Sequence, residues 1–418
     1  MILGVIADDF TGATDVASML VRAGMRTVQV IGVPEGPPPE DADAVVVALK
    51  SRTCPAPQAV RDSLQALRWL QAGGARRFYF KYCSTFDSTA QGNIGPVAEA
   101  LLDALGSDFT IACPAFPENG RTVFRGHLFV GDQLLSDSGM REHPLTPMTD
   151  ANLVRVLQAQ CRGRVALAGH PVVARGPQAL RAHFDALRAA GARFAVVDAI
   201  DDAALRTLAG ACAELPLVTA GSGLALALPA VYEAQGLLRP DAQAARLPAV
   251  GGSAGVLSGS CSSATREQVA HWLAQGRPAY RVQARALAAG EDVAAQALDW
   301  SAAQGETPVL VYATAAPEEV RAVQAELGAQ AAGQLVEDCL ARVAAGWVQR
   351  GVRRLVVAGG ETSGAVVQQL SVQRLRIGPM IDPGVPWTQV AGRPLLLALK
   401  SGNFGTPDFF AKALAQVQ

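Results

Sequence analysis

The sequence predicts an α/β protein of two domains, each a largely parallel sheet flanked by helices. Short, near-continuous apolar runs alternate with segments whose apolar residues recur every three or four positions, the pattern of buried strands alternating with amphipathic helices. The chain has 418 residues, well above the roughly 150 expected of one domain. Residues 235–255 lose this periodicity and are rich in Pro, Gly and Ala, which is typical of a linker. We therefore expect domains over residues 1–240 and 250–418.

In the first 225 residues, strands are predicted wherever a short apolar run stands between polar or glycine-containing segments. These runs are Ile2–Ala7, Thr27–Ile31, Ala44–Leu49, Phe78–Lys81, Phe109–Ala112, Arg164–Ala168, Phe194–Asp198 and Leu217–Thr219. Helices are predicted between most of them from the helical spacing of apolar residues. These segments are Ala13–Ala23, Ala59–Gln71, Val97–Ala104, Ala151–Gln160 and Gln178–Ala189. The alternation favours a parallel sheet, because parallel strands need long crossover connections.

One segment of the first half, Pro114–Thr149, contains no convincing helix and is rich in Gly, Pro, His and Arg. A stretch of that length without regular structure is uncommon inside a compact domain unless it serves a function. We expect an elaborated hairpin or a lid, in the form of a small excursion that covers a site.

A second strand–helix series follows the linker. Its predicted strands are Gly255–Ser258, Ala279–Val282, Pro308–Tyr312, Arg354–Ala358 and Pro394–Leu399. Near the C-terminus, Thr406 and Pro407 have the residue types of an N-cap and a first helical turn. We therefore expect the last helix to begin there.

Composition excludes several classes of protein. Half of the residues are hydrophobic and 17% are charged, so the chain is not mainly disordered. The net charge of −1 argues against sequence-independent binding to nucleic acid or to an anionic membrane. No stretch approaches the roughly 20 apolar residues of a membrane helix. Small-molecule ligands remain the expected partners, and the sequence leaves open whether the chain forms a homo-oligomer.

The cysteines and histidines are scattered. The seven cysteines include no C-x-x-C pair, and the five histidines include no H-x-x-x-H pair. An odd number of dispersed cysteines favours reduced thiols in the cytoplasm, and the spacing argues against a structural zinc site. No metal ligands are predicted.

The first candidate site is the run Ala7-Asp8-Asp9-Phe10-Thr11-Gly12-Ala13-Thr14-Asp15, where the first strand gives way to the first helix. Ligands of open α/β sheets bind outside the carboxyl ends of the strands. Adjacent carboxylates there are costly unless they meet a cation, a metal or a hydroxyl. We take Asp8 and Asp9 as candidate catalytic residues and Asp15 as a substrate-binding candidate. The alternative is that Asp9 or Thr11 only caps the helix.

Further polar clusters follow later strands of the first domain. They supply the candidates Arg52, Lys81, Ser84, Asp87 and Arg121. A Lys or Arg at a strand end can hold a small carboxylate, with Arg offering bidentate geometry, and Asp87 is a candidate base. The alternative for each cluster is an ordinary polar loop.

The second half has three Gly/Ser-rich turns, each after an apolar strand. They are Leu257-Ser258-Gly259-Ser260-Cys261-Ser262, Ala358-Gly359-Gly360-Glu361-Thr362-Ser363-Gly364 and Lys400-Ser401-Gly402-Asn403-Phe404-Gly405. Glycine lets backbone N–H groups approach a phosphate at a helix N-terminus. Neither G-x-x-x-x-G-K-[ST] nor an initial G-x-G-x-x-G is present. The turns together predict a nucleotide pocket of non-Walker type.

Five long motifs resemble the four-carbon acid sugar kinase family. They are ADDFTGATD, KYCSTFDSTAQGNIG, CPAFPENGRTVFRGHLFV with HPLTPMTD, VVAGGETSGAV and KSGNFG. The third motif, with HPLTPMTD, is most similar to the 3-oxo-tetronate kinases within that family, and the resemblance covers essentially the whole chain. It implies an N-terminal sugar-acid-binding domain and a C-terminal nucleotide-binding domain.

The resemblance also implies the reaction, which is ATP-dependent phosphorylation of the C4 hydroxyl of 3-oxo-tetronate. Mg²⁺ would accompany the nucleotide, and the two domains would close over the substrates. By motif match, the residues that contact ATP would be Ser258, Gly360, Glu361, Thr362, Ser363 and Asn403. The base is not settled by the resemblance. Asp9 and Asp87 lead, Asp8 could instead orient a cation or hydroxyl, and Glu118 and Glu361 come next.

Other functions remain open at this point. The substrate could be threonate or erythronate, which are the unoxidised relatives of the 3-oxo acid. A sugar-acid-binding regulator is a second alternative, although no basic helix-turn-helix is present. A dinucleotide-dependent dehydrogenase is disfavoured because the first turn lacks the glycine fingerprint.

Overall fold

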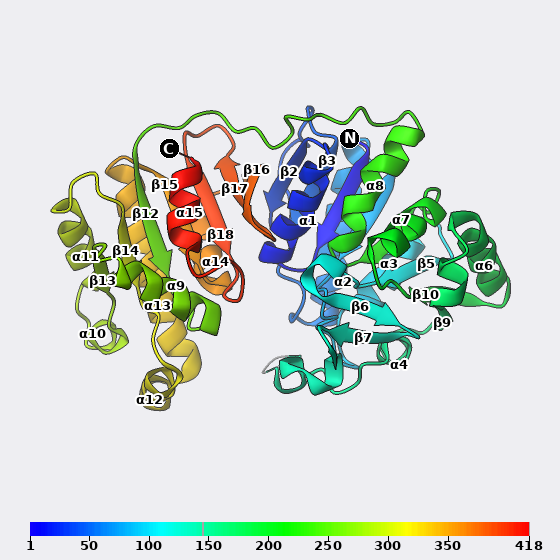
Figure 1. Ribbon diagram of the computed structural model, residues 1–418, viewed down its shortest axis with the longest axis horizontal. Helices are drawn as coiled ribbons and strands as arrows, with labels where there is room; N and C mark the ends of the chain where they lie inside the picture. The colour runs from blue at the N-terminus through cyan, green and yellow to red at the C-terminus, as the bar shows by residue number, and fades with distance from the viewer. Residues whose placement is uncertain (144–145, 418) are drawn as a thin grey trace. The chain divides into compact units, whose positions relative to one another are not determined.

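The computed structural model describes residues 1–143 and 146–417, and it divides into two compact units, Met1–Ala245 and Arg246–Gln418. Strands and helices alternate along both units (Figure 1). The predicted fold class, α/β with a mostly parallel sheet flanked by helices, is confirmed. Among the described residues, no helix combines the length and the apolar character needed to cross a membrane.

The sheet of the first unit is parallel throughout, with the strand order β2-β3-β1-β4-β11-β5-β10-β9. The strands are β1 (Leu3–Ala7), β2 (Thr27–Ile31), β3 (Ala44–Ala48), β4 (Arg77–Lys81), β5 (Thr110–Cys113), β9 (Arg164–Ala168), β10 (Ala192–Val197) and β11 (Leu217–Ala220). All residues of β1 and β3 are buried. Because both faces of these strands are covered, their sequences are continuous apolar runs.

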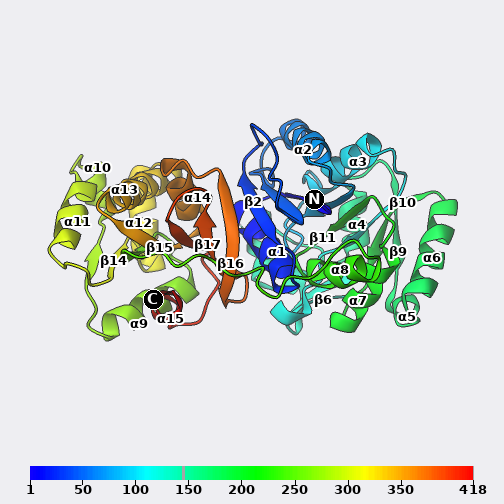
Figure 2. The same cartoon turned by 90° about the horizontal axis from the view of Figure 1, so that it is seen from above.

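Helices cover both faces of this sheet, and Figure 2 shows α2 and α3 on one face and α1, α7 and α8 on the other. The helices are α1 (Phe10–Arg22), α2 (Ala56–Ala72), α3 (Ile94–Ala104), α4 (Leu153–Gln158), α5 (His170–Val173), α6 (Pro177–Ala189), α7 (Asp202–Ala211) and α8 (Gly223–Ala234). Asp9 is the N-cap of α1, and its carboxylate accepts from the N–H of Gly12. The capping alternative for Asp9 is therefore correct as a local description.

The excursion after β5 is a small antiparallel sheet with single-turn helices. Its strands are β6 (Arg121–Phe124), β7 (His127–Val130) and β8 (Gln133–Leu134). Its 3₁₀ turns are η1 (Pro117–Asn119), η2 (Leu135–Asp137) and η3 (Gly139–Glu142). The buried carboxylate of Asp198 anchors the hairpin by accepting the N–H groups of Arg125 and Gly126 at 2.7 and 2.8 Å. Pro144 and Leu145 of the HPLTPMTD motif lie outside the described residues.

The sheet of the second unit has the order β13-β14-β12-β15-β18-β17-β16. Its strands are β12 (Ser253–Ser258), β13 (Ala279–Arg281), β14 (Val309–Tyr312), β15 (Val352–Ala358), β16 (Arg374–Asp382), β17 (Val385–Val390) and β18 (Leu396–Lys400). The order runs parallel from β13 to β18, whereas β17 is antiparallel to both of its neighbours in this order. The antiparallel hairpin of β16 and β17 was not predicted, because Gly and Pro interrupt its apolar pattern.

Helices also cover both faces of the second sheet (Figure 2). They are α9 (Ser263–Ala274), α10 (Ala284–Ala288), α11 (Val293–Ala302), α12 (Pro317–Leu327), α13 (Ala329–Gln349), α14 (Gly360–Gln369) and α15 (Phe409–Gln416). Trp272 of α9 and Phe409 and Phe410 of α15 pack with Trp387 of β17 into one buried cluster. These two helices therefore cover the sheet through a large aromatic core.

The last helix begins later than expected. α15 starts at Phe409, and Thr406 is not its N-cap. The N–H and the hydroxyl of Thr406 both donate to the buried carboxylate of Asp382, at 2.9 Å each. A tertiary contact thus overrides the local capping signal. The predicted linker, residues 235–255, contains neither helix nor strand up to residue 252, and its last three residues belong to β12, which begins at Ser253.

The two units share one topological feature that places their sites. In the first unit the chain passes from β3 on one side of β1 to β4 on the other, and in the second it passes from β14 to β15 across β12. Each central strand therefore lies at a point where the strand order reverses. The crevice outside the carboxyl ends of the strands at such a point is where open α/β sheets bind their ligands.

Candidate active site

The carboxyl ends of the central strands of the first unit lie level with one another. Ala7 of β1 is in register with Ala48 of β3 and with Lys81 of β4, which is in register with Ala220 of β11. The residues that follow these strands therefore gather at one edge of the sheet. This brings the predicted acidic run and the predicted Arg52 and Lys81 clusters together.

Arg52 is the centre of this polar cluster. Its Nε and a terminal nitrogen donate to the two oxygens of Asp8 at 2.9 and 3.0 Å. A terminal nitrogen also lies 2.8 Å from Asp9 Oδ1, and the other lies 3.5 Å from Asp87 Oδ2. The three carboxylates predicted as catalytic candidates thus share one guanidinium. Arg52 is committed to protein carboxylates, which makes it a poor anchor for a further anion.

The two adjacent aspartates have opposite pKa shifts. Burial raises the pKa of Asp8, and its bond to Arg52 offsets this only in part. Burial acts in the same direction on Asp9, but the charges of Arg52 and Lys81 outweigh it and its pKa is lowered. Asp9 also accepts the Thr11 hydroxyl at 2.9 Å. Asp9 is therefore a firmly ionised cap, with little tendency to accept a proton.

The loop after β4 positions Asp87. Asp87 Oδ1 accepts the Thr85 hydroxyl at 2.5 Å, and the longer contact to Arg52 leaves Oδ2 the least engaged oxygen of the cluster. Phe86 between them has a φ of 53° and is fully buried. An aromatic residue in the left-handed region is strained and persists only where its surroundings fix it. Strain of this kind is common at functional sites.

Lys81 brings a buried cation to the same edge. Its side chain is 2% exposed, and Nζ donates to the carbonyl of Tyr82 at 2.8 Å. A Cβ built on Gly12 would lie 2.9 Å from this nitrogen and 2.1 Å from Asp9 Oδ1. Gly12 is therefore required for the close approach of the cation and the acid to the first turn of α1.

A second group of polar atoms in this unit lacks partners. Asp15 Oδ1 and Arg121 Nε are buried and make no hydrogen bond among the described residues, and the buried hydroxyl of Ser222 lies beside Asp15. Burial raises the pKa of Asp15, which Lys81 and Ser222 partly oppose. Buried polar atoms without partners are uncommon in native proteins and call for an explanation such as a ligand.

The remaining predicted residues of this unit are less engaged. Ser84 is half-buried in the loop after β4. Glu118, considered as a reserve base, instead pairs with Arg22 on the surface, at 2.7 Å.

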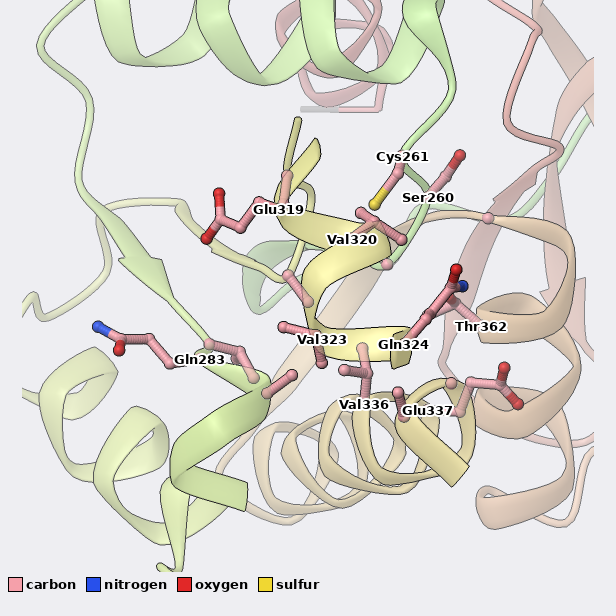
Figure 3. A pocket seen from close by; sticks show the side chains of 18 of the residues that line it. Ser260, Cys261, Gln283, Glu319, Val320, Val323, Gln324, Val336, Glu337 and Thr362 are labelled. Atoms are coloured by element: carbon pink, nitrogen blue, oxygen red, sulfur yellow. The ribbon is translucent and has the colours of Figure 1, made fainter. Parts of the chain in front are cut away.

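In the second unit, a cavity of about 590 Å³ opens at the ends of β12 and β15. It is lined on one side by Gly259, Ser260 and Cys261 and on another by Gly359 to Thr362. Helices α10, α12 and α13 complete it, and Figure 3 shows Val320, Val323 and Val336 around it. A volume between 300 and 1,000 Å³ with apolar walls and a few polar groups is typical of a small-molecule site.

The three Gly/Ser-rich turns come together here, because Ser258, Ala358 and Lys400 end adjacent strands in register. A Cβ on Gly259 would lie 2.2 Å from the hydroxyl oxygen of Thr362, and one on Gly402 would lie 2.5 Å from that of Ser260. Glycine is thus needed where the turns touch.

The N-terminus of α14 faces this cavity without a cap. Gly359, with a φ of 131°, precedes the helix and supplies no side chain to its first N–H groups. By contrast, α9 is capped by Ser262, whose hydroxyl accepts from Thr265. Uncapped N–H groups and the helix dipole together attract anions, phosphates above all.

The predicted ATP contacts differ in their surroundings. Gly360, Glu361 and Thr362 line the cavity. Ser258 is buried with its hydroxyl 2.7 Å from that of Thr314, and the buried hydroxyl of Ser363 has no hydrogen-bond partner among the residues that the structure describes. Asn403 lies exposed on the third turn.

No group of three or more His, Cys, Asp or Glu side chains suited to a metal ion occurs among the described residues.

Comparison with known proteins assigns a family. Residues 3–228 match the family described as a sugar-binding N-terminal domain, and residues 256–410 match the one described as a nucleotide-binding C-terminal domain. A 3-oxo-tetronate kinase of Cupriavidus necator is 64% identical over 100% of this chain and 97% of its own length. The chain belongs to the 3-oxo-tetronate kinase family. The family resemblance carried by the sequence motifs is thereby confirmed.

Other members of the 3-oxo-tetronate kinase family are also similar along the whole chain. The relative from Pseudomonas fluorescens is 62% identical over 100% of this chain and 97% of its own length, and that from Brucella melitensis is 49% identical over 99% and 95%. A crystal structure from Salmonella typhimurium LT2 is 46% identical with a TM-score of 0.91, covering 100% of this chain and 99% of that one. One from Haemophilus influenzae is 45% identical with a TM-score of 0.84, covering 99% and 100%.

Sequence reasoning missed two residues of this family member's first site. Asn93 Nδ2 donates to the carbonyls of Ser51 and Cys54 at 2.7 and 2.8 Å, which fixes the loop that carries Arg52. Ser222 lies at the N-terminus of α8 beside Asp15. Asn93 and Ser222 are each adjacent to a glycine in the sequence, and this was the only local feature that could have marked them as site residues.

Proposed function

We propose that this chain is an ATP-dependent kinase that phosphorylates the C4 hydroxyl of 3-oxo-tetronate. The observation that carries the proposal is the identity of 49–64% along the full length to proteins named 3-oxo-tetronate kinase. The product is 3-oxo-tetronate 4-phosphate, and the reaction belongs to the catabolism of four-carbon acid sugars.

The second unit is assigned the nucleotide, and the first unit the sugar acid. The uncapped N-terminus of α14 at the cavity supports this, since it suits phosphate groups. The apolar side chains of Val320, Val323 and Val336 suit an adenine ring. Mg²⁺ would arrive with the phosphates, because it is usually held by phosphate oxygens, water and one or two carboxylates. Its role is to offset phosphate charge.

In the first unit, Asp87 is the proposed base. A primary alcohol is not ionised at neutral pH, so its proton must leave as the new P–O bond forms. Asp87 Oδ2 is the least engaged carboxylate oxygen of the cluster. Asp8 instead fixes Arg52 through both oxygens, and Asp9 caps α1.

The substrate carboxylate is assigned to Lys81 and Arg121. Arg52 is occupied by three protein carboxylates. Within the described residues, Lys81 donates only to the Tyr82 carbonyl, and Arg121 donates to the Asn119 carbonyl while its Nε makes no hydrogen bond. Asp15 and Ser222 would then receive substrate hydroxyl or keto groups. Ser84, at the same strand end, is a further candidate for substrate contact.

The experiment that tests the proposed function is an ADP-release assay of the whole protein over a panel of C4 acids. The panel contains threonate, erythronate and their 3-oxo forms. We expect the highest kcat/KM with a 3-oxo acid and a 4-phosphate product by NMR. A preference for threonate or erythronate would identify the runner-up kinase, and binding of the acid without ADP release would identify a regulator.

The cysteines suit a cytoplasmic enzyme. All seven are free, and Cys113, Cys212 and Cys339 are buried. Free thiols persist in the reducing compartment that also supplies ATP.

A further inference from the structure

The loop that follows β18, Ser401–Thr406, has its carbonyl groups held by buried side chains. Gln268 of α9 is 1% exposed, and its Nε2 lies 3.0, 3.0 and 3.1 Å from the carbonyl oxygens of Phe404, Gly405 and Thr406. Gln268 Oε1 is buried and has no partner among the described residues. The side-chain amide of Gln268 therefore points its NH₂ group toward the loop.

Lys400 holds the beginning of the same loop. Its side chain is fully buried, and Nζ donates to the carbonyls of Ser401 and Gly402 at 3.1 and 3.0 Å and to the Thr265 hydroxyl at 2.9 Å. The Thr265 hydroxyl in turn donates to the Gly402 carbonyl at 2.7 Å. Among the described residues, no carboxylate forms an ion pair with Lys400, so its ammonium group donates to the loop carbonyls and to Thr265.

Peptide geometry converts these bonds into a direction for the loop amides. In a planar trans peptide, a carbonyl and the N–H of the next residue point in opposite directions. The carbonyls of Ser401, Gly402 and Phe404 point to buried donors. The N–H groups of Gly402, Asn403 and Gly405 therefore point to the side opposite these donors, and none has a backbone acceptor in the described chain. The N–H of Thr406, which follows the held carbonyl of Gly405, differs in donating to the carboxylate of Asp382. Outward amides in succession form an anion-binding concavity.

The loop borders the nucleotide cavity, since a Cβ on Gly402 would meet Ser260, which lines it. We propose that Gln268 and Lys400 are positioning residues that aim the amides of Gly402, Asn403 and Gly405 at the phosphate chain of the nucleotide. This rests on the proposed function. Asn403 then contributes through its backbone N–H. Gln268 and Lys400 do not touch the nucleotide themselves, and they determine the affinity for its phosphates by holding the loop.

The test compares ADP with adenosine, because only ADP carries phosphates. The whole protein and its Gln268→Met variant are titrated with ADP by calorimetry and with adenosine by ligand-observed NMR. We expect the Kd for ADP to rise about tenfold to a hundredfold, as for loss of charge-assisted bonds, and that for adenosine to stay within twofold. Gln275→Met is the matched control, because Gln275 ends the same helix and is exposed.

A second pair guards against a variant that does not fold. Thr265→Val removes the hydroxyl that accepts from Lys400 and donates to the Gly402 carbonyl, and Thr265→Ser retains it. We expect the ADP-specific loss in the first and rescue in the second. An unchanged Kd for ADP in both Gln268→Met and Thr265→Val, or an equal rise of the Kd for ADP and for adenosine, would overturn this inference. Either result would leave the proposed function standing. Absence of ADP binding by the unsubstituted protein would contradict the proposed function as well.

Discussion

Arg52 shows how one side chain can define the chemistry of its neighbours. Its guanidinium joins Asp8, Asp9 and Asp87, yet the three carboxyl groups have different surroundings. Burial keeps the pKa of Asp8 raised, while neighbouring positive charge keeps that of Asp9 lowered. Environments that separate the pKa values of neighbouring carboxyl groups are typical of sites that handle protons.

We expect Asp87→Asn to lower kcat by about 10²–10⁴-fold, the usual range for loss of a general base. The Kd for ADP should remain unchanged, and the Thr85 hydroxyl can still donate to the amide oxygen. Steady-state kinetics and calorimetry measure both quantities. Asp9→Asn is the control, because Asn is an equally good N-cap. Near-normal kcat in Asp87→Asn with a large loss in Asp8→Asn would move the base to Asp8.

We expect Arg121→Gln to raise KM for the sugar acid about tenfold to a hundredfold, because charge-assisted hydrogen bonds contribute about 1.5–3 kcal/mol. KM for ATP should stay constant. Arg155→Gln serves as the control, since Arg155 pairs with Asp150 on the surface of the same unit. Equal KM values for the acid in the two variants would exclude Arg121 as an anchor.

At the scale of elements, the turn between β15 and α14 combines two glycines with different requirements. Gly359 has a positive φ, and a Cβ there would lie 2.8 Å from the Thr362 hydroxyl oxygen. A Cβ on Gly360 or on Gly364 would meet nothing within 4 Å. Gly360 lines the cavity, so a side chain introduced there would occupy space that a ligand in the cavity would need.

We therefore expect Gly360→Leu to weaken ATP binding at least about tenfold while the protein remains folded. Gly364→Leu, on the same helix but outside the cavity lining, should leave ATP affinity unchanged. Replacing glycine inside a helix adds roughly 0.5–1 kcal/mol of stability, so thermal denaturation should show both variants folded. Equal ATP affinities would mean that the nucleotide does not occupy the space beside Gly360.

Lys400 makes the stability of this region depend on pH. Burial lowers its pKa to about 7 from 10.5. Between these values the unfolded chain binds more protons at this residue than the folded one, so this residue's contribution to the unfolding free energy rises with pH. We expect unfolding by urea to show wild type gaining stability relative to Lys400→Met from pH 7 to pH 9. A constant difference would indicate that Lys400 stays fully charged when folded.

At the scale of the whole molecule, the same reversal of strand order occurs in both units. β1 and β12 are each flanked by a later strand on either side, and the polar residues or glycines that follow them form the candidate sites. The first site is dense in charge, whereas the second is rich in glycine and backbone amides. The difference matches a small polar acid in one unit and a phosphate chain in the other.

We expect hydrogen–deuterium exchange of the whole protein to separate these ligands. A non-hydrolysable ATP analogue should protect amides at 259–262, 359–363 and 401–405, and the sugar acid should protect those at 8–15 and 81–88. Amides that donate to a bound ligand exchange more slowly because opening must be coupled to dissociation. Protection of 8–15 by the ATP analogue alone would reverse the assignment of the two units.

Much of this arrangement could be predicted from sequence. Apolar runs followed by polar or glycine turns placed Asp8, Lys81 and Gly360 at strand ends, because local patterns determine strands and turns. The hairpin of β16 and β17 escaped prediction, since Gly and Pro interrupt it. Gln268 carried no signal at all, because its role depends on carbonyls more than 130 residues away.

The sequence by itself determined the alternation of strands and helices, and the predicted strands end within one residue of those in the structure. It also carried the family through long motifs. Only the tertiary structure decided which charges meet. Asp8 and Arg52 are 44 residues apart, and a parallel sheet brings such strand ends together in an order set by long crossovers. Local propensity acts over a few residues, whereas strand order depends on packing across the whole domain, so pairing and buried unpartnered atoms emerge only in the folded molecule.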